Sequence, residues 1–352
     1  SFNIGFASAG VQRYFNGSID EVISWDRVLS PEEVNATYSA GVWKLYRNFT
    51  SLSSGTYTYK AYVVDQAGNL NSTEERTFIV NTVPVVSAVL INSTLGTNLT
   101  TENLTAYVTS SENDSDGYTL IHDWRKNGIS DAVLNMPFNV NGSNGNTSNV
   151  KDYTTYSSNG TKIVNATNTG VRWNASCGAF AGSGGCYEFD DIDDYLNIPH
   201  NSNLNFGNGG LTFSLWVRTT DVATSTTRTF VSKNYGAGGK GFLLSQYGAG
   251  VVLYLNSTSS VFDNWGYLTA NTWHYVTIVL DSSSYNATAY KNGAFVSTIH
   301  LDEWNITNTE KMVIGATGTS LLMNGSLDQI MLFKRALSAS EIAMLYNNGA
   351  GM

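Results

Sequence analysis

The chain has 352 residues, 42% of them hydrophobic and only 13% charged, and its formal net charge is −9 at pH 7. This length predicts two or more domains, and the many Ser, Thr, Asn, Gly and Tyr residues suit short strands and turns, so we expect an all-β protein with minor short helices. The sequence has no basic stretch and no apolar run of ~20 residues, which excludes nucleic acid as a partner and a membrane span in this chain.

Residues 1–42 are expected to be the C-terminal strands and short helix of a domain whose body they lack. Residues 15–33 align with residues 323–341, at an offset of 308. In both copies an alternating strand pattern is followed by Ser and, three residues later, by Glu, which is the spacing of a helix capping box. Because Ser1 begins no recognisable signal sequence, we expect the chain to be a mature or excised piece.

The middle of the chain contains two pieces, residues 43–82 and 83–140, which resemble immunoglobulin-like modules of the polycystic-kidney-disease type. The resemblance rests on the motifs at residues 55–69, 76–80, 103–109, 114–117 and 123–128. The closing half (43–82) precedes the opening half (83–140). Either the halves join as a permuted domain, or each completes a sandwich with another copy. Residues 141–149 are the predicted linker to the next domain.

Residues 150–352 contain closely spaced strand patterns separated by turn residues, which indicates two packed β-sheets. In residues 211–218 the apolar side chains alternate, so we expect Leu211, Phe213, Leu215 and Val217 on one face of a half-buried strand. The expected strands are 186–189, 195–198, 211–218, 229–233, 241–246, 251–255, 273–281, 286–291, 294–299, 311–315 and 327–333.

Four motifs in residues 150–352 resemble the signature strands of laminin-G-like, concanavalin-A-like jelly rolls. They lie at residues 187–199, 211–217, 272–277 and 324–338. The resemblance implies a two-sheet jelly roll, with the segment 1–42 as a partial second copy of its tail. It does not fix the function, since this superfamily includes lectins, adhesion modules, structural spacers and glycosidases.

The sequence also carries signs of an oxidising, extracellular location. Cys177 and Cys186 are separated by a flexible Gly-rich loop, which predicts a disulfide; a two-thiol metal site is disfavoured because the histidines are scattered. Asn-x-Ser/Thr acceptors number 17, more than chance predicts, so we expect N-glycosylation at a cell surface. The acceptors are Asn16, Asn35, Asn48, Asn71, Asn92, Asn98, Asn103, Asn113, Asn141, Asn146, Asn159, Asn165, Asn174, Asn256, Asn286, Asn305 and Asn324.

We expect no catalytic residues. A glucanase on a jelly roll needs paired carboxylates facing one cleft, and Glu188 and Asp190 alternate but have no third acid in phase. His274 is not accompanied by a nucleophile motif, so a packed or hydrogen-bonded strand histidine is the expected role.

The densest acidic cluster, residues 190–194, is a candidate calcium site because hard cations prefer oxygen ligands. The candidate ligands are Asp191, Asp193 and Asp194, and the resemblance adds Asp328. The alternative is a solvated turn whose carboxylates cap backbone amides. A second group of acids, Asp65, Asp114 and Asp116, is better explained by turn capping. The aromatic residues Trp265, Tyr267 and Trp304 are candidates for stacking on sugars or for the core.

The first functional hypothesis is a non-catalytic extracellular structural or adhesive protein, as in repetitive surface proteins of archaea and bacteria. The alternative is a calcium-dependent carbohydrate-binding module. Apolar residues of the N-terminal segment, such as Ile19, Val22, Ile23 and Trp25, predict head-to-tail strand complementation with other copies of the chain in a filament. A permuted monomer and an excised repeat of a longer protein are the competing arrangements.

Overall fold

The computed structural model describes residues 4–7, 13–20, 22–39, 52–81, 83–112, 117–142, 148–163, 170–180, 184–223, 225–233, 239–255 and 259–347. The chain divides into two compact units, residues 1–118 and residues 119–352. Within the described ranges, no helix combines the length and apolar character needed to cross a membrane.

The first unit consists of short two-stranded sheets and one helix. The paired strands are β1 (Phe6–Ala7) with β2 (Arg13–Tyr14), β3 (Gly55–Tyr59) with β6 (Arg76–Val80), β4 (Tyr62–Val64) with β5 (Leu70–Ser72), and β7 (Val85–Ser93) with β8 (Leu104–Ser111), and the helix is α1 (Pro31–Ser39). Among the described residues of this unit, Ser93 alone is buried. These ladders therefore form no packed sandwich within the described residues, and the immunoglobulin-like interpretation stays a prediction.

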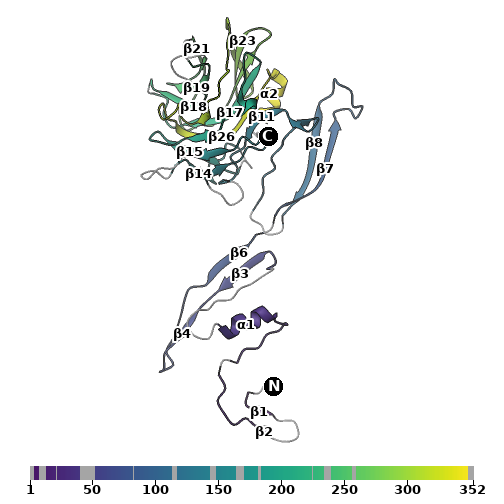
Figure 1. Cartoon of the computed structure of the whole chain (residues 1–352), viewed down its shortest axis with the longest axis vertical. Coiled ribbons are helices and arrows are strands. Elements are labelled where there is room, and N and C mark those ends of the chain that lie inside the picture. The colour runs from purple at the N-terminus through teal and green to yellow at the C-terminus, as the bar shows by residue number, and fades with distance from the viewer. Residues whose placement is uncertain are drawn as a thin grey trace. The chain divides into compact units, whose positions relative to one another are not determined.

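The second unit is a sandwich of two eight-stranded sheets, which confirms the predicted all-β, concanavalin A-like jelly roll (Figure 1). Sheet I has the order β14 (Arg172–Asn174), β15 (Cys186–Asp190), β26 (Asn324–Phe333), β17 (Leu211–Thr219), β22 (His274–Asp281), β23 (Asn286–Lys291), β24 (Ala294–His300), and β11 (Ala132–Met136) also pairs with β26. Sheet II has the order β12 (Asn149–Val150), β13 (Gly160–Lys162), β16 (Leu196–Ile198), β25 (Met312–Ile314), β18 (Thr227–Lys233), β19 (Phe242–Tyr247), β20 (Gly250–Leu255), β21 (Ser259–Tyr267). A small hairpin, β9 (Arg125–Lys126) with β10 (Ile129–Ser130), a 3-10 turn, η1 (Ser202–Leu204), and the helix α2 (Ala339–Tyr346) complete the unit.

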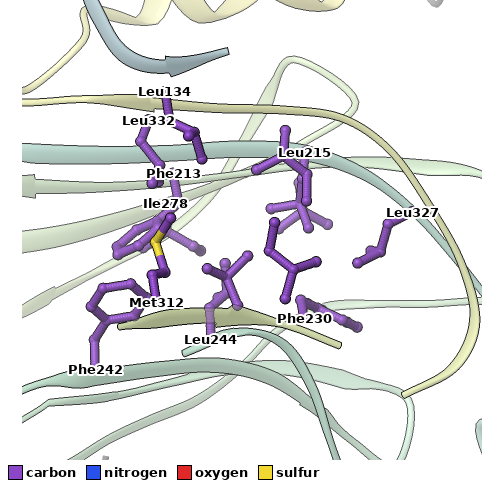
Figure 2. Packing of buried hydrophobic residues seen from close by; sticks show 14 of the residues in the cluster. Leu134, Phe213, Leu215, Phe230, Phe242, Leu244, Ile278, Met312, Leu327 and Leu332 are labelled. Atoms are coloured by element: carbon purple, nitrogen blue, oxygen red, sulfur yellow. The ribbon is translucent and has the colours of Figure 1, made fainter. Parts of the chain in front are cut away.

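The core lies between the two sheets. Figure 2 shows Phe213, Leu215 and Ile278 of sheet I facing Phe230 and Leu244 of sheet II. The predicted alternation of β17 is confirmed, since Leu211, Phe213, Leu215 and Val217 all belong to this core. Burial of such side chains on both inner faces is the main force that holds the two sheets together.

The outer face of sheet I is also covered, so β17 is buried on both faces rather than half-buried. Helix α2 lies on this face, where Ile342 and Leu345 join Trp216 of β17 in a second apolar cluster. The helix starts where predicted, because Ser338 and Glu341 form a complete capping box. A sequence pattern cannot reveal this cover, since the helix comes from the other end of the domain.

The jelly roll begins earlier in the chain than the sequence analysis placed it. Residues 132–136, assigned there to an immunoglobulin-like half, form β11, which pairs with β26 from Ala132 to Met136. The described residues of the expected linker 141–149 likewise belong to this unit, since the Gly142 amide donates to the Tyr187 hydroxyl and Asn149 pairs with Thr161. Pairing between strands about 200 residues apart leaves no local sequence signal, which explains the difference.

In the segment 1–42 the helix is confirmed and the strand is not. Helix α1 begins with the predicted capping box, in which the Glu33 amide donates to the Ser30 hydroxyl and the Ser30 amide donates to the Glu33 carboxylate. The described residues of 15–30, which align with β26, are irregular in conformation. A strand needs a neighbouring strand for its backbone hydrogen bonds, whereas a helix makes its own.

Candidate functional site

A cavity of about 340 Å³ opens at one end of sheet I, over the strands β14, β15, β26 and β17. Five of the side chains that line it are charged, two of them basic and three acidic. The lining residues are Gly170, Arg172, Glu188, Phe189, Asp190, Asp194, Arg218, Thr220, Gly325 and Ser326. We call this cavity the rim pocket.

The floor of the rim pocket is a row of polar residues that crosses all four strands. The register pairs Arg172 with Glu188, Glu188 with Ser326, and Ser326 with Arg218. The residues next to them on β15, β17 and β26 point the other way, into the apolar core. Because side chains alternate along a strand, the row lies on the outer face of sheet I.

The charges in this row are paired with one another. The Glu188 carboxylate accepts from the Arg172 guanidinium and from the Asn174 amide, the latter at 3.0 Å. The Arg218 guanidinium lies 3.7 Å from the same carboxylate and donates to the Ser326 hydroxyl at 3.0 Å. Both arginines thus have partners on neighbouring strands, Glu188 for Arg172 and Ser326 for Arg218.

The wall of the pocket is formed by the acidic turn that follows β15. Oxygen atoms of Asp190, Asp193 and Asp194 all lie within 4.8 Å of one another, and we call these three residues the acid cluster. Asp194 is buried and accepts from the Asp190 backbone amide at 3.2 Å, while Asp190 accepts from the Ile192 amide at 2.9 Å. These bonds to backbone amides hold the carboxylates close together despite their like charges.

The spacing of the acid cluster fits a calcium ion. Calcium–oxygen distances of about 2.4 Å allow two ligand oxygens to be at most about 4.8 Å apart, which is the limit that the cluster satisfies. Three carboxylates supply fewer than the six to eight oxygens that calcium takes, so backbone, water or ligand oxygens would complete the shell.

The structure does not bring all four predicted ligands together. Asp191 has a positive φ of 68° and turns to Arg228, whose guanidinium donates to its carboxylate at 2.9 Å. Asp328 is fully buried and accepts from the backbone amides of Ala179 and Gln329, both at 2.9 Å. It also lies four residues along β26 from Asn324, the partner of Asp190, which corresponds to roughly 13 Å. Asp190, which was not among the predicted ligands, takes the third place instead.

Known proteins resemble the unit that carries this pocket. Residues 190–343 match the family model "Laminin_G_3: Concanavalin A-like lectin/glucanases superfamily". This match includes the acid cluster and β26, and it begins after Arg172 and Glu188. No curated protein sequence matches the chain.

Solved structures similar to the chain include the binding domains of a mosquitocidal protein and of botulinum neurotoxins. The binding domain of Paraclostridial Mosquitocidal Protein 1 is 18% identical with a TM-score of 0.49, and the match covers 62% of this chain and 52% of that one. The Botulinum Neurotoxin serotype G binding domain is 19% identical with a TM-score of 0.48, over 61% and 50% of the two chains. The Botulinum neurotoxin serotype D ligand binding domain, in complex with N-acetylneuraminic acid, is 16% identical with a TM-score of 0.47, over 62% and 50%. The chain thus spans about half the length of these structures.

The predicted disulfide of the concanavalin A-like unit is formed, with Cα atoms of Cys177 and Cys186 5.4 Å apart. It closes the loop that precedes β15. The loop is tied to sheet I a second time, because the Ala179 amide donates to Asp328 of β26 and the Phe180 ring lies 5.9 Å from the Trp216 ring. Asp328 therefore has a structural role, positioning this loop.

Several other predicted residues lie away from the rim pocket. Trp304 is buried, and its indole nitrogen donates to the Gly209 carbonyl, so it is a core residue rather than a sugar-stacking surface. His274 is also buried and accepts from the Thr269 amide, the expected role of a strand histidine. Asp65 caps its own turn by accepting from the Ala67 and Asn69 amides. Asp114 and Asp116, and the side chains of Trp265 and Tyr267, lie outside what the structure describes.

The arginines of the rim pocket were not predicted from the sequence. Arg218 had a signal, since the alternation of residues 211–218 places it on the face opposite Leu211 and Val217. Arg172 had none, because β14 is only three residues long and carries no alternating pattern. Only the pairing of four strands brings the two arginines to one carboxylate.

Proposed function

We propose that the jelly roll is a non-catalytic, lectin-like binding domain that holds a glycan in the rim pocket. The observation that carries this proposal is the meeting of two arginines and three carboxylates in one cavity of about 340 Å³. Sugar hydroxyls both donate and accept hydrogen bonds, and an array of guanidinium donors and carboxylate acceptors suits them. With three acids and two bases at the pocket, a neutral glycan fits better than a strongly anionic one.

We propose that calcium contributes to this binding through the acid cluster. Asp190, Asp193 and Asp194 would hold the ion at the pocket wall, where hydroxyl oxygens of the sugar could coordinate it. The carboxylates of Asp191 and Asp328 are engaged elsewhere, so the proposal leaves out these two of the predicted ligands.

The interactions and positions of the pocket carboxylates disfavour a hydrolytic role. Glu188 is held by Arg172, Arg218 and Asn174, so it has little freedom to act as a general acid. A glycosidase also needs a second carboxyl group across the scissile bond, and Asp190 is packed beside Asp194 instead.

The test is a glycan array probed with and without chelator. Binding should require calcium and should fall at least tenfold in both Asp194→Asn and Arg218→Ala. The matched control is Asp302→Asn, an exposed acid outside the pocket. Binding that survives chelation and both pocket substitutions unchanged would contradict the proposal. Millimolar calcium should also raise the melting temperature of chelated protein, and Asp194→Asn should abolish this shift.

We propose that the protein is extracellular and N-glycosylated. Seven of the predicted acceptors are exposed in the structure: Asn16, Asn35, Asn71, Asn92, Asn98, Asn103 and Asn141. Asn159, Asn174, Asn286, Asn305 and Asn324 are half-buried, and Asn48, Asn113, Asn146, Asn165 and Asn256 lie outside the described residues. The Asn174 amide nitrogen, the atom a glycan would join, donates to Glu188, so we expect this site to stay bare. Glycopeptide mass spectrometry of material from the natural source checks both expectations.

A second candidate is a structural or adhesive role as a self-assembling surface subunit. It is favoured by the exposed apolar side chains of the first unit, which include Val89, Leu90 and Ile91 on β7 and Ile19, Val22 and Ile23 in the N-terminal segment. Exposed apolar patches of this kind mark surfaces at which another chain binds. The test is to measure the molecular mass of the purified protein at increasing concentrations. Head-to-tail assembly predicts oligomers that grow with concentration, and a monomer at all concentrations would contradict it.

A further inference from the structure

Two segments of this chain, residues 15–38 and residues 323–346, share details of local structure beyond their alignment. Both carry the capping box, and both carry an ion pair from an arginine to the box glutamate. The Arg27–Glu33 distance is 2.6 Å, and the Arg335–Glu341 distance is 2.7 Å. The two segments therefore build the same helix start, one at α1 and the other at α2.

The apolar residues of the strand are buried in one copy and exposed in the other. In β26, Leu327, Ile330, Met331 and Phe333 are at most 5% exposed. Their equivalents Ile19, Val22, Ile23 and Trp25 are 47%, 51%, 56% and 38% exposed. Residues 15–38 therefore keep the apolar pattern of a strand buried on both faces without the burial that explains it.

The surroundings of one aligned glycine, Gly325 in the second copy and Gly17 in the first, differ between the two copies in the same way as those of the apolar side chains. Gly325 has a φ of +143°, and a Cβ there would lie 2.1 Å from the Arg218 carbonyl oxygen, because β17 passes directly beside it. Gly17 occupies the same place with a φ of +156°, yet a Cβ there would meet only the ring of Phe15. The first copy thus retains the glycine, which its own φ also favours, without the neighbouring strand that packs against the glycine in the second copy.

We infer that residues 15–38 are a donor strand and helix that complete a second concanavalin A-like body, one with an open place between strands equivalent to β15 and β17. This inference rests on the proposed structural role and names the surface that such a role would use. Residues 16–25 would pair with both strands as β26 does, and the helix α1 would cover the outer face of the sheet as α2 does.

The contacts of the second copy specify the partner further. Arg335 reaches Asp131 at 2.7 Å, and Asp328 accepts the Ala179 amide. The partner should therefore offer Arg27 an acid in the place of Asp131, and offer Asp20 a backbone amide in the place of Ala179. A flat apolar surface without open strand edges would supply neither the acid nor the backbone amide.

The test is a full-chain chimaera in which the sequence of residues 15–38 replaces residues 323–346. The jelly roll should still fold, with a closed disulfide, a cooperative urea transition and the wild-type dependence on urea, at a lower midpoint. The same chimaera carrying Gly325→Val, and one with the inserted sequence scrambled, should lose the transition. A chimaera that behaves like the scrambled control would overturn the inference.

A second measurement applies if the junctions of the chimaera make it insoluble. A synthetic peptide of residues 13–40 should bind the full chain carrying Gly325→Val, whose own strand is held less tightly, and should not bind the wild-type chain. A peptide carrying Gly17→Val should bind neither. Equal binding of the two peptides, or none, would overturn the inference. If the chimaera folds while the wild-type chain stays monomeric, the inference stands and self-assembly fails.

Discussion

At Gly325 the backbone of β26 lies so close to β17 that a Cβ atom would be 2.1 Å from the Arg218 carbonyl oxygen. A side chain there would overlap the backbone of β17, which cannot move without breaking its own ladder. We expect Gly325→Val to lower the free energy of unfolding by about 3 kcal/mol or more. Gly209→Ala is the control, since its Cβ would lie 3.4 Å from the Phe206 carbonyl at an ordinary backbone angle, and it should change stability by no more than about 0.5 kcal/mol. Urea denaturation checks both variants.

His274 makes the stability of the jelly roll depend on pH. Burial, and to a lesser extent the charge of Lys291, lowers the pKa of His274 to about 4. In the unfolded chain the pKa returns to about 6.5, so between these values the unfolded state binds the extra proton. Stability should therefore fall as the pH is lowered from 6.5 to 4, by up to about 3 kcal/mol.

The substitution His274→Gln isolates this contribution from that of the carboxylates. The difference in unfolding free energy between wild type and variant, measured by urea denaturation at pH 4, 5, 6 and 7, should shrink as the pH falls. A difference that is constant across this range would show that His274 takes up its proton equally in the folded and unfolded chains.

The loop closed by Cys177 and Cys186 is the element that leads into the rim pocket. Closing a loop of about ten residues is expected to stabilise the fold by roughly 2–3 kcal/mol, chiefly by restricting the unfolded chain. The double substitution of both cysteines by alanine should lower the unfolding free energy by that amount. It should also weaken glycan binding, because Glu188 follows Cys186 on β15. Stability equal to that of the wild type would mean that the loop is already held by Ala179 and Asp328.

The strands of the jelly roll were the elements best predicted from the sequence. Every expected strand between residues 186 and 333 appears within about three residues of its predicted ends, because alternation and turn residues are local signals. Among the missed strands, β11 pairs with β26 about 200 residues away, β14 is only three residues long, and β21 was not foreseen either. At the site, the many acidic residues within 190–194 allowed the acid cluster to be predicted. Which of these side chains come together depends on the backbone conformation at Asp190 and Asp191, which the sequence does not reveal.

At the scale of the whole molecule, the two units differ in how they are stabilised. The jelly roll has two apolar clusters, whereas the described residues up to Tyr118 form hairpins with a single buried side chain. Isolated two-stranded hairpins are only marginally stable in water. We expect limited proteolysis of the dilute chain to cut within residues 1–118 first and to leave a resistant fragment that begins near residue 119. Early cuts within residues 186–333 would contradict this expectation.

The position of β26 has a consequence for how the domain is made. This strand is nearly the last element of the jelly roll to leave the ribosome, yet it lies between β15 and β17, which are synthesised more than a hundred residues earlier. Until it arrives, the two earlier strands have open edges and one sheet is split, so the nascent domain cannot reach its native state by adding strands in order. During this interval the growing chain is exposed to mispairing, and its maturation depends on the speed of translation and on whatever shields those edges.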